Sequence, residues 1–557
     1  MTRGEGGRIS IQSPDQPDYR RRLGEVLSQP GVLEIILLAT VFIVYSGTLA
    51  FGFVYDDHPV FVENPLVHAW RYVPSYFSTY FGSQLAGANA TYYRPVFLLW
   101  FRLIHSLAGL HPALWHLSTV LVHVAVTYLV FLLAWRLTGD RWTAWIAALL
   151  YGLHPVHVES VAWISGVADP LLALFFLSAL LAYLKHRQRG ASAAWLAASL
   201  LLYAMALLQK EVAIVLPAVV FMYVVLFVPE DKGWGPKLRS AVVGALPFLA
   251  VTALYLVVRS WALHGMVRTI APISVKTMIL TWPSLLWFYL KLLVYPVGLS
   301  PFYDAGYVTK LGLRDFVLPL AGVLAAAALL WFWARRSPAQ ARTIAFACAF
   351  LVLPLMPALY IRVFNYGDYA HDRYLYLPSV GFVILCALAI RQLPHAKLQA
   401  ALVAAIAALL LAGTITQQLN WASDLLLYTR GTSIAPSNLV ARNNLGNALL
   451  ERGRYPDAVA VYQQVLKQDP NFWMATYNLG YVSYRLHKFD DAEQYLSRAI
   501  VLNPNDADEY FVRGASRVES GHVDAGIADL KRAVQMRPDA EPYRAMLRQA
   551  IERQPQK

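Results

Sequence analysis

The sequence predicts an all-α protein in which a bundle of membrane-spanning helices is followed by a solenoid of helical repeats. Three observations support this prediction. Of the 557 residues, 57% are hydrophobic and only 15% are charged, apolar runs of about 20 residues recur up to residue 419, and a 34-residue period occupies the remainder. Runs of that length match the thickness of a bilayer, and soluble proteins carry more charge. The composition therefore excludes an ordinary soluble globular protein.

The apolar runs predict about 11 or 12 hydrophobic segments within a membrane domain over residues 31–419. They lie at 31–54, 112–135, 141–158, 170–185, 192–209, 211–229, 240–258, 277–298, 316–334, 342–361, 374–390 and 398–416. The first run is too long for a cleaved signal peptide, and no small-residue cleavage site follows it. We therefore expect it to stay in the membrane as the first span.

Basic residues flank the runs unevenly, which predicts how the chain threads the membrane, because positive charge marks the cytoplasmic side. The clusters lie at Arg20–Arg22, Arg136/Arg141, Lys185/Arg187/Arg189, Lys232/Lys237/Arg239, Arg335/Arg336 and Arg391/Lys397. All become cytoplasmic in an 11-crossing topology in which segment 277–298 does not cross. With 12 crossings, Arg335 and Arg336 would lie outside. The favoured 11-crossing topology makes 1–30 a cytoplasmic tail and puts the first loop, 55–111, and the C-terminal region outside.

The net charge of +13 lies beside the membrane and not in the repeats. Residues 437–557 hold 16 Lys and Arg against 15 Asp and Glu. Because no basic face is found outside the membrane region, we expect no nucleic-acid partner. Cys348 and Cys386 lie in apolar runs without the spacing of a disulfide framework or a metal site.

The 34-residue period begins after Asn420. It relates Pro436, Pro470, Pro504 and Pro538, and also Gly446, Gly480 and Gly514. This period, with its small, aromatic and proline positions, is typical of the tetratricopeptide repeat, a pair of antiparallel helices. Since each unit buries its apolar face only by stacking, we expect one domain over residues 420–557. Its three full repeats are expected at 437–470, 471–504 and 505–538.

Aromatic residues on the first helix of the second repeat suggest a peptide-binding groove. They are Tyr477, Tyr481 and Tyr484. First helices of such repeats line the concave face, where aromatic and polar groups suit an extended peptide. The alternative is that the repeats only cap the membrane domain or support its folding.

Five motifs of the membrane region carry a resemblance to a known family. They are "YDDHPVFVENP" (55–65), a "YYRP" segment (92–123), "HPVHVESVAWISGVADPL" (154–171), "QKEVAIVLP" (209–217) and "DRYLYLPSVGF" (372–382). In this order, with repeats after them, they resemble the transmembrane and tetratricopeptide-repeat (TMTC) O-mannosyltransferases and their bacterial relatives. The resemblance implies a GT-C glycosyltransferase that uses a polyprenyl- or dolichyl-phosphate sugar. The chain departs from the family in its short repeat array and in Val167, where Arg is expected.

Asp56 and Asp57 follow the first apolar run directly, at the membrane surface. A carboxylate there can meet a lipid-borne donor and accept the proton of an attacking hydroxyl. Two adjacent acids also repel, which raises the pKa of at least one of them. With the resemblance, this pair is the expected catalytic site, and Asp56 is favoured as the base. The alternative is a polar flank that ends the helix.

Three cations are expected to bind the donor phosphate: Arg94, Lys210 and Arg373. Arg bonds phosphate bidentately and Lys acts as a point charge, although both also extend to the membrane surface without binding anything. A second group is expected to position the substrates or to brace its loop: His154, His157, Glu159 and Asp169. No ligand set is completed around "HPVH", so no metal site is expected.

These features predict an enzyme that moves a hexose, by resemblance mannose, from the lipid phosphate to protein Ser/Thr hydroxyls with inversion. The repeats would present the acceptor, and no cofactor is expected, although a divalent cation on the carboxylates stays as an alternative. Two rival functions stay open: a lipid or glycan acceptor, and a non-enzymatic membrane scaffold. The expected location is a bacterial inner membrane with the site and repeats in the periplasm, or the lumenal side of the endoplasmic reticulum in a eukaryote.

Overall fold

The computed structural model describes residues 31–79, 92–188, 190–227, 233–263, 273–364 and 367–554. Within these ranges all regular secondary structure is helical. The all-α prediction is therefore confirmed. The predicted cytoplasmic tail, residues 1–30, lies outside the described ranges, as do Arg189 and Lys232 of the basic clusters.

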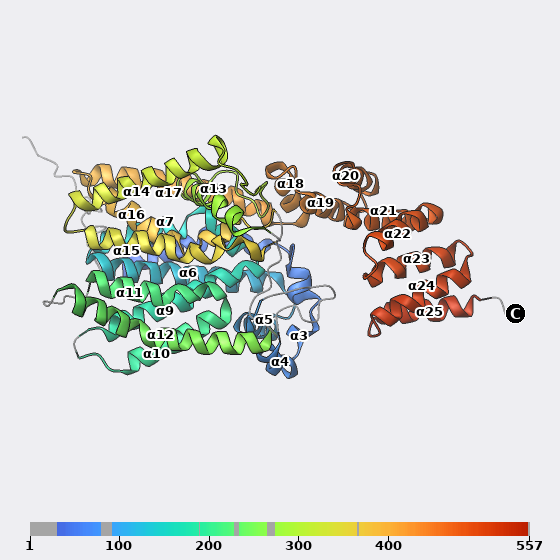
Figure 1. Cartoon of the computed structure of the whole chain (residues 1–557), viewed down its shortest axis with the longest axis horizontal. Coiled ribbons are helices and arrows are strands. Elements are labelled where there is room, and N and C mark those ends of the chain that lie inside the picture. Colours follow the sequence, from blue (N-terminus) through green and yellow to red (C-terminus); the bar gives the residue numbers. More distant parts are fainter. Residues whose placement is uncertain are drawn as a thin grey trace, which may run out of the picture.

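The membrane domain is a bundle whose helices follow the predicted apolar runs (Figure 1). They are α2 (Val32–Tyr45), α6 (Pro112–Thr138), α7 (Arg141–Gly152), α9 (Ala168–His186), α10 (Ala194–Gln209), α11 (Leu216–Phe227), α12 (Trp234–Ala262), α13 (Val275–Val294), α14 (Leu318–Arg336), α15 (Ala341–Val352), α16 (Ser379–Arg391) and α17 (Ala396–Gln418). Among the described residues, eight helices are long and apolar enough to span a membrane when adjoining turns are included. The others are shorter than 18 residues, so length alone does not identify them as spans.

The first predicted outer loop folds into short helices at one end of the bundle (Figure 1). They are α3 (Pro65–His68), α4 (Val73–Ser78) and α5 (Pro95–Ala108). Arg102 of α5 is buried and donates to the carbonyl of Val67 at 2.7 Å, which holds α5 against α3. This end of the bundle faces the repeats.

Basic residues gather at the opposite end of the bundle. Arg391 donates to Asp140 at 3.2 Å, and Gln392 donates to Gln340 at 2.9 Å. The turns that follow α6, α14 and α16 therefore lie together. Arg136 and Lys185 line a common cavity at the ends of α6 and α9. This clustering is what the 11-crossing topology requires.

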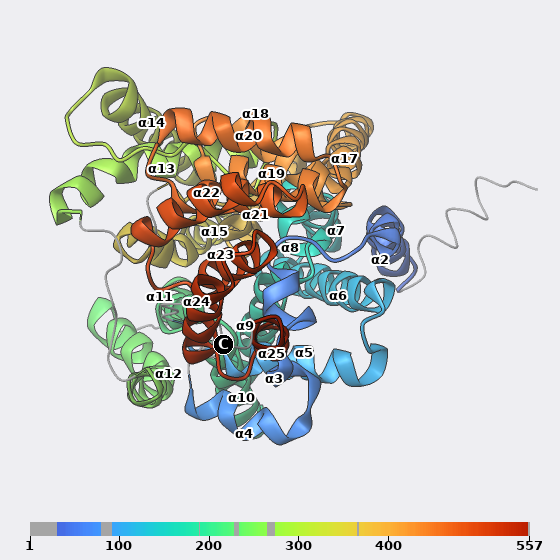
Figure 2. The same cartoon turned by 90° about the vertical axis from the view of Figure 1, so that its right-hand side faces the viewer.

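Helix α13 contacts loops of the repeat-facing end near its start and at its end. Thr281 Oγ1 accepts from the backbone N–H of Val308 at 3.1 Å, near the start of the helix. At its end, the carbonyl of Leu293 is 3.0 Å from His154 Nε2. Both partners belong to loops of this one end, onto which Figure 2 looks. By length and composition α13 is one of the eight helices that could span a membrane, so whether segment 277–298 crosses stays a prediction.

The repeat domain has the predicted helix pairs. They are α19 (Leu439–Glu451) with α20 (Tyr455–Gln468), α21 (Trp473–Arg485) with α22 (Phe489–Leu502), and α23 (Ala507–Glu519) with α24 (Val523–Met536), preceded by α18 (Asp424–Ile434) and closed by α25 (Glu541–Glu552). The recurring glycine allows each pair to approach closely. A Cβ at Gly480 would lie 2.6 Å from Leu496 Cγ, and one at Gly446 would lie 2.3 Å from the Tyr462 ring. These close contacts explain why glycine recurs every 34 residues at this position of the repeat.

The position of α13 yields a topological prediction. In a background without Cys348 and Cys386, an impermeant thiol reagent should label Lys276→Cys, Lys310→Cys and Gln463→Cys from the same side of the membrane, because all three exposed positions belong to the repeat-facing end. The control, Lys185→Cys at the opposite end, should react only after permeabilisation. Labelling of Lys276→Cys together with this control would mean that α13 crosses.

Candidate functional site

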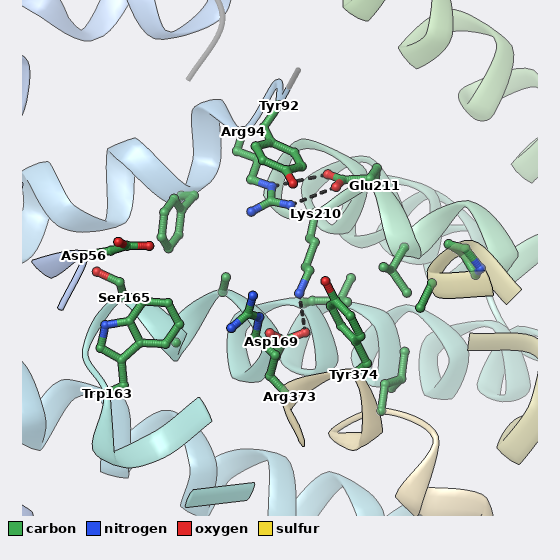
Figure 3. Close-up of a pocket in the computed structure, with 18 of the residues that line it drawn as sticks. Asp56, Tyr92, Arg94, Trp163, Ser165, Asp169, Lys210, Glu211, Arg373 and Tyr374 are labelled. Atoms are coloured by element: carbon green, nitrogen blue, oxygen red, sulfur yellow. Dashed lines mark hydrogen bonds and ion pairs between the residues drawn. The ribbon is translucent and has the colours of Figure 1, made fainter. Parts of the chain in front are cut away.

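A pocket of about 420 Å³ lies at the repeat-facing end of the bundle (Figure 3). Its walls come from five separate parts of the chain: 55–60, 92–97, 163–172, 210–212 and 354–378. Five of the predicted site residues line it: Asp56, Arg94, Asp169, Lys210 and Arg373. The motifs singled out in the sequence therefore meet in space.

Asp56 presents its carboxylate to this pocket (Figure 3). It follows the end of the first apolar segment, and its side chain is partly exposed. Burial raises the pKa of the Asp56 carboxyl to about 6, while the nearby Arg373 charge acts in the opposite direction. A carboxylate with this pKa can accept a proton near neutral pH and release it again.

Asp57 has a different environment from its neighbour. Its side chain is completely buried and accepts from the backbone N–H of Val54 at 3.1 Å. Its other oxygen accepts from Ser165 twice, from the backbone N–H at 2.9 Å and from the hydroxyl at 2.7 Å. Asp57 is not part of the pocket lining. It ties the loop to the turn before α9, so only one of the two acids faces the pocket.

The main cause of the raised pKa values of Asp56 and Asp57 differs from the one expected from the sequence. Burial raises the pKa of the Asp57 carboxyl to about 7, and repulsion from Asp56 is the smallest of the contributions. Burial is also the largest contribution at Asp56. The prediction that at least one pKa is raised is confirmed, but mutual repulsion is the wrong primary cause.

Each predicted phosphate-binding cation is paired with a carboxylate. Arg94 donates to both oxygens of Glu211, at 2.8 and 3.2 Å. Lys210 donates to Asp169 at 2.6 Å, and both side chains are buried. The three pairs are completed by Arg373 and Glu159, which are joined through the Arg373 backbone N–H at 2.9 Å and through the guanidinium. Buried charges require such partners, which hold the cations in place around the pocket.

Aromatic rings surround the two arginines (Figure 3). The Arg94 guanidinium lies 4.3 Å from the centre of the Tyr92 ring. That of Arg373 lies 5.6 Å from the Trp163 ring and 5.5 Å from the Tyr374 ring. Sequence reasoning missed these aromatic residues as well as Glu211 and Ser165. All stand within the quoted motifs, and Tyr92, Glu211 and Tyr374 also lie within two residues of a predicted cation, which was the available signal.

His154 and His157 are buried and do not line the pocket. His154 Nε2 lies 3.0 Å from the Leu293 carbonyl, and His157 bridges the Tyr151 carbonyl at 2.8 Å and the Ser379 hydroxyl at 2.9 Å. Both rings are therefore fixed by hydrogen bonds inside the protein. Their geometry fits the alternative expectation, in which they brace the loop. Within the described part of the chain, no group of three or more His, Cys, Asp or Glu could hold a metal ion.

The three tyrosines proposed for the acceptor groove lie on α21 and are half-buried. Tyr477 and Tyr481 stack with ring centres 6.3 Å apart, and Arg485 donates to the Tyr481 hydroxyl at 3.1 Å. They and Tyr484 also pack on a small cluster formed by Ala492, Leu496 and Val512. Part of each ring is thus used to join α21 to α22 and α23, and part is open to solvent.

Comparison with known families agrees with the two-part organisation. Residues 114–274 match the family described as dolichyl-phosphate-mannose-protein mannosyltransferase. Residues 443–507 and 479–552 match two tetratricopeptide-repeat families.

Similar proteins carry the same combination in their names. Protein O-mannosyl-transferase TMTC3 of Mus musculus is 27% identical over 93% of this chain and 60% of its own length. Protein O-mannosyl-transferase F38B6.6 of Caenorhabditis elegans is 27% identical over 79% of this chain and 63% of its own. TMTC2 of Homo sapiens is 36% identical over 34% of this chain and 24% of its own. The chain thus spans less than two thirds of the length of these relatives.

Among solved structures, the oligosaccharyltransferase of Archaeoglobus fulgidus aligns with 76% of this chain and 58% of its own. The identity is 14% and the TM-score is 0.37. The sequence matches are sufficient to confirm the resemblance expected from the five motifs. The chain is similar over most of its length to TMTC protein O-mannosyl-transferases, and it matches a mannosyltransferase family over part of its membrane domain and tetratricopeptide-repeat families after it.

Proposed function

We propose that this protein is a GT-C membrane glycosyltransferase that transfers mannose from a polyprenyl- or dolichyl-phosphate donor to Ser/Thr hydroxyls of proteins. The observation that carries the proposal is the meeting of Asp56 with Arg94, Lys210 and Arg373 in one pocket. An available carboxylate and several fixed cations are what attack by a hydroxyl and departure of a phosphate require.

In the proposed reaction, Asp56 accepts the proton of the acceptor hydroxyl while that oxygen attacks C1 of the sugar. The bond between C1 and the donor phosphate oxygen breaks, and its electron pair leaves with the phosphate. Attack on the face opposite the leaving group inverts the configuration at C1. The three cations lie where they can stabilise the phosphate, and Arg373 already interacts electrostatically with Asp56.

The donor and acceptor would reach the pocket from different sides. The apolar helices around it suit a lipid chain, and the repeats that follow suit a protein acceptor, which is why a protein is favoured over a lipid or glycan. The gathering of basic residues at the opposite end of the bundle supports an orientation with the pocket outside the cytoplasm. That side would be the bacterial periplasm or the lumen of the endoplasmic reticulum.

Replacement of the proposed base should abolish transfer while leaving the fold intact. Asp56→Asn keeps the shape of the side chain and removes its basicity, so kcat should fall by about 10²–10⁴-fold. The donor affinity should change little. Both quantities can be measured with purified protein, a labelled lipid-phosphate mannose and an acceptor peptide.

Asp57→Asn is the matched control, because it removes the same charge one residue away. Its buried hydrogen bonds to Val54 and Ser165 would be disturbed, so it should lower stability by about 1–3 kcal/mol while folded molecules still turn over. A wild-type kcat in Asp56→Asn would rule out Asp56 as the base.

The pH dependence of the reaction should report the ionisation of Asp56. The base must be deprotonated, and burial raises the pKa of Asp56 to about 6. We therefore expect kcat/KM to be level above this pH and to fall about tenfold per unit as pH drops below it. Asp57→Asn should keep this acidic limb. A profile that stays level down to pH 4, with the protein still folded, would contradict the assignment.

The repeats are proposed to present protein acceptors and to take no part in the chemistry themselves. Tethering an acceptor near the pocket raises its local concentration. Deletion of 437–557, which leaves α18 in place, should reduce modification of full-length protein acceptors. Transfer to a short peptide at high concentration should persist, which also shows that the membrane domain has folded. Equal modification of protein acceptors by the shortened chain would disprove recruitment.

A further inference from the structure

The helix that links the membrane domain to the repeats makes direct contact with the start of the catalytic loop. Asp424, the first residue of α18, accepts from the backbone N–H of Tyr55 at 2.8 Å. Its second oxygen lies 3.6 Å from His58 Nε2. One carboxylate from a distant part of the chain therefore holds the residues on both sides of Asp56 and Asp57.

The backbone at Tyr55 has an unusual conformation that this contact fixes. Its φ is 58°, in the left-handed region, and it shares this with only one other non-glycine residue among those described, His487. Bulky side chains rarely adopt this conformation, so neighbouring contacts must hold it. The next residue, Asp56, faces the pocket, whereas Asp57 turns the other way to Ser165.

The Tyr55 side chain is held by rings from three other segments. Its ring centre lies 5.4 Å from that of Trp163, 5.8 Å from Phe302 and 6.3 Å from Tyr428. Tyr428 lies one turn after Asp424 on α18, so the same helix supplies both the hydrogen bond and part of the aromatic cage. Tyr55 itself lines the pocket.

We propose that Asp424 is a positioning residue for the base: by accepting from the Tyr55 backbone it fixes the left-handed turn that points Asp56 into the pocket. This inference rests on the proposed function, since it concerns the same site. It means that α18 belongs to the active site, although it precedes the repeats in which an acceptor would bind.

A second contact between the two parts of the chain provides a control. Asp304 accepts from the Ser437 hydroxyl at 2.7 Å and from its backbone N–H at 3.3 Å. This exposed contact joins the region around α13 to the start of the repeats without touching Tyr55. A variant at Asp304 therefore loosens the junction but leaves the turn at Tyr55 in place.

The experiment compares Asp424→Ala, Asp424→Asn and Asp304→Ala in the full-length chain. Asp424→Ala removes the acceptor, so kcat should fall at least about tenfold while KM for the donor changes less than about twofold. The acidic limb of the pH profile should move to lower pH, because Asp56 becomes more hydrated. Asp424→Asn keeps an acceptor oxygen, and it should retain most of the activity, as should Asp304→Ala.

Amide hydrogen exchange over residues 51–62 supplies a readout that needs no turnover. Exchange at the Tyr55 amide should rise at least about tenfold in Asp424→Ala and stay near wild type in the other two variants. If Asp424→Ala does not fold, Asp424→Ser, whose hydroxyl is too short to reach Tyr55, should give the same pattern.

Unchanged kcat and exchange in Asp424→Ala would overturn the inference, as would an equal loss of activity in Asp304→Ala. A loss of kcat with unchanged exchange would also overturn it, because the effect would then not pass through the loop. An inactive wild-type chain would instead overturn the proposed function. The exchange data would then still decide whether Asp424 holds the turn, but that turn would have no catalytic meaning.

Discussion

The architecture of the pocket depends on one constraint: a charge removed from water needs a partner of opposite sign. The three cation–carboxylate pairs, Arg94–Glu211, Lys210–Asp169 and Arg373–Glu159, join residues that are 117, 41 and 214 positions apart. Each pair therefore fastens one loop of the membrane domain to another. Removing one member of a pair would leave the other charge buried and uncompensated. The three pairs therefore hold the loops between the apolar helices in one arrangement, and this arrangement defines the cavity.

Hydrogen bonding separates the roles of the two adjacent acids. Asp57 satisfies its carboxylate with three hydrogen bonds inside the protein, and it thereby fixes the loop. Asp56 has no comparable set of donors among the described residues and faces the pocket, so its charge is available to a substrate. The left-handed conformation of Tyr55 comes directly before the two acids. It directs the Asp56 side chain into the pocket and the Asp57 side chain into the surrounding protein.

Much of the fold could be predicted from the sequence, because hydrophobic runs and a 34-residue period are local signals. The helices of the bundle and all three repeats follow those signals. The site could be predicted only as a set of residue types. Which acid faces the pocket, that Glu211 pairs with Arg94, and that His157 bonds Ser379 all depend on contacts between distant segments. The two histidines were expected either to position the substrates or to brace their loop, and only their contacts with distant segments favour the bracing role.

The pairing of the cations also bears on how the proposed reaction would be accelerated. A sugar attached to a lipid phosphate carries one negative charge as a diester, and the departing phosphate gains a second. In the resting pocket Glu211, Asp169 and Glu159 already balance the three cations. The donor would thus meet cations whose attraction is partly satisfied, while the charge that develops during bond breaking increases the demand on them. Interactions that strengthen between ground state and transition state raise kcat, whereas uniform binding does not. Cations that are already paired with carboxylates should bind the donor with modest affinity and stabilise mainly the phosphate as it departs.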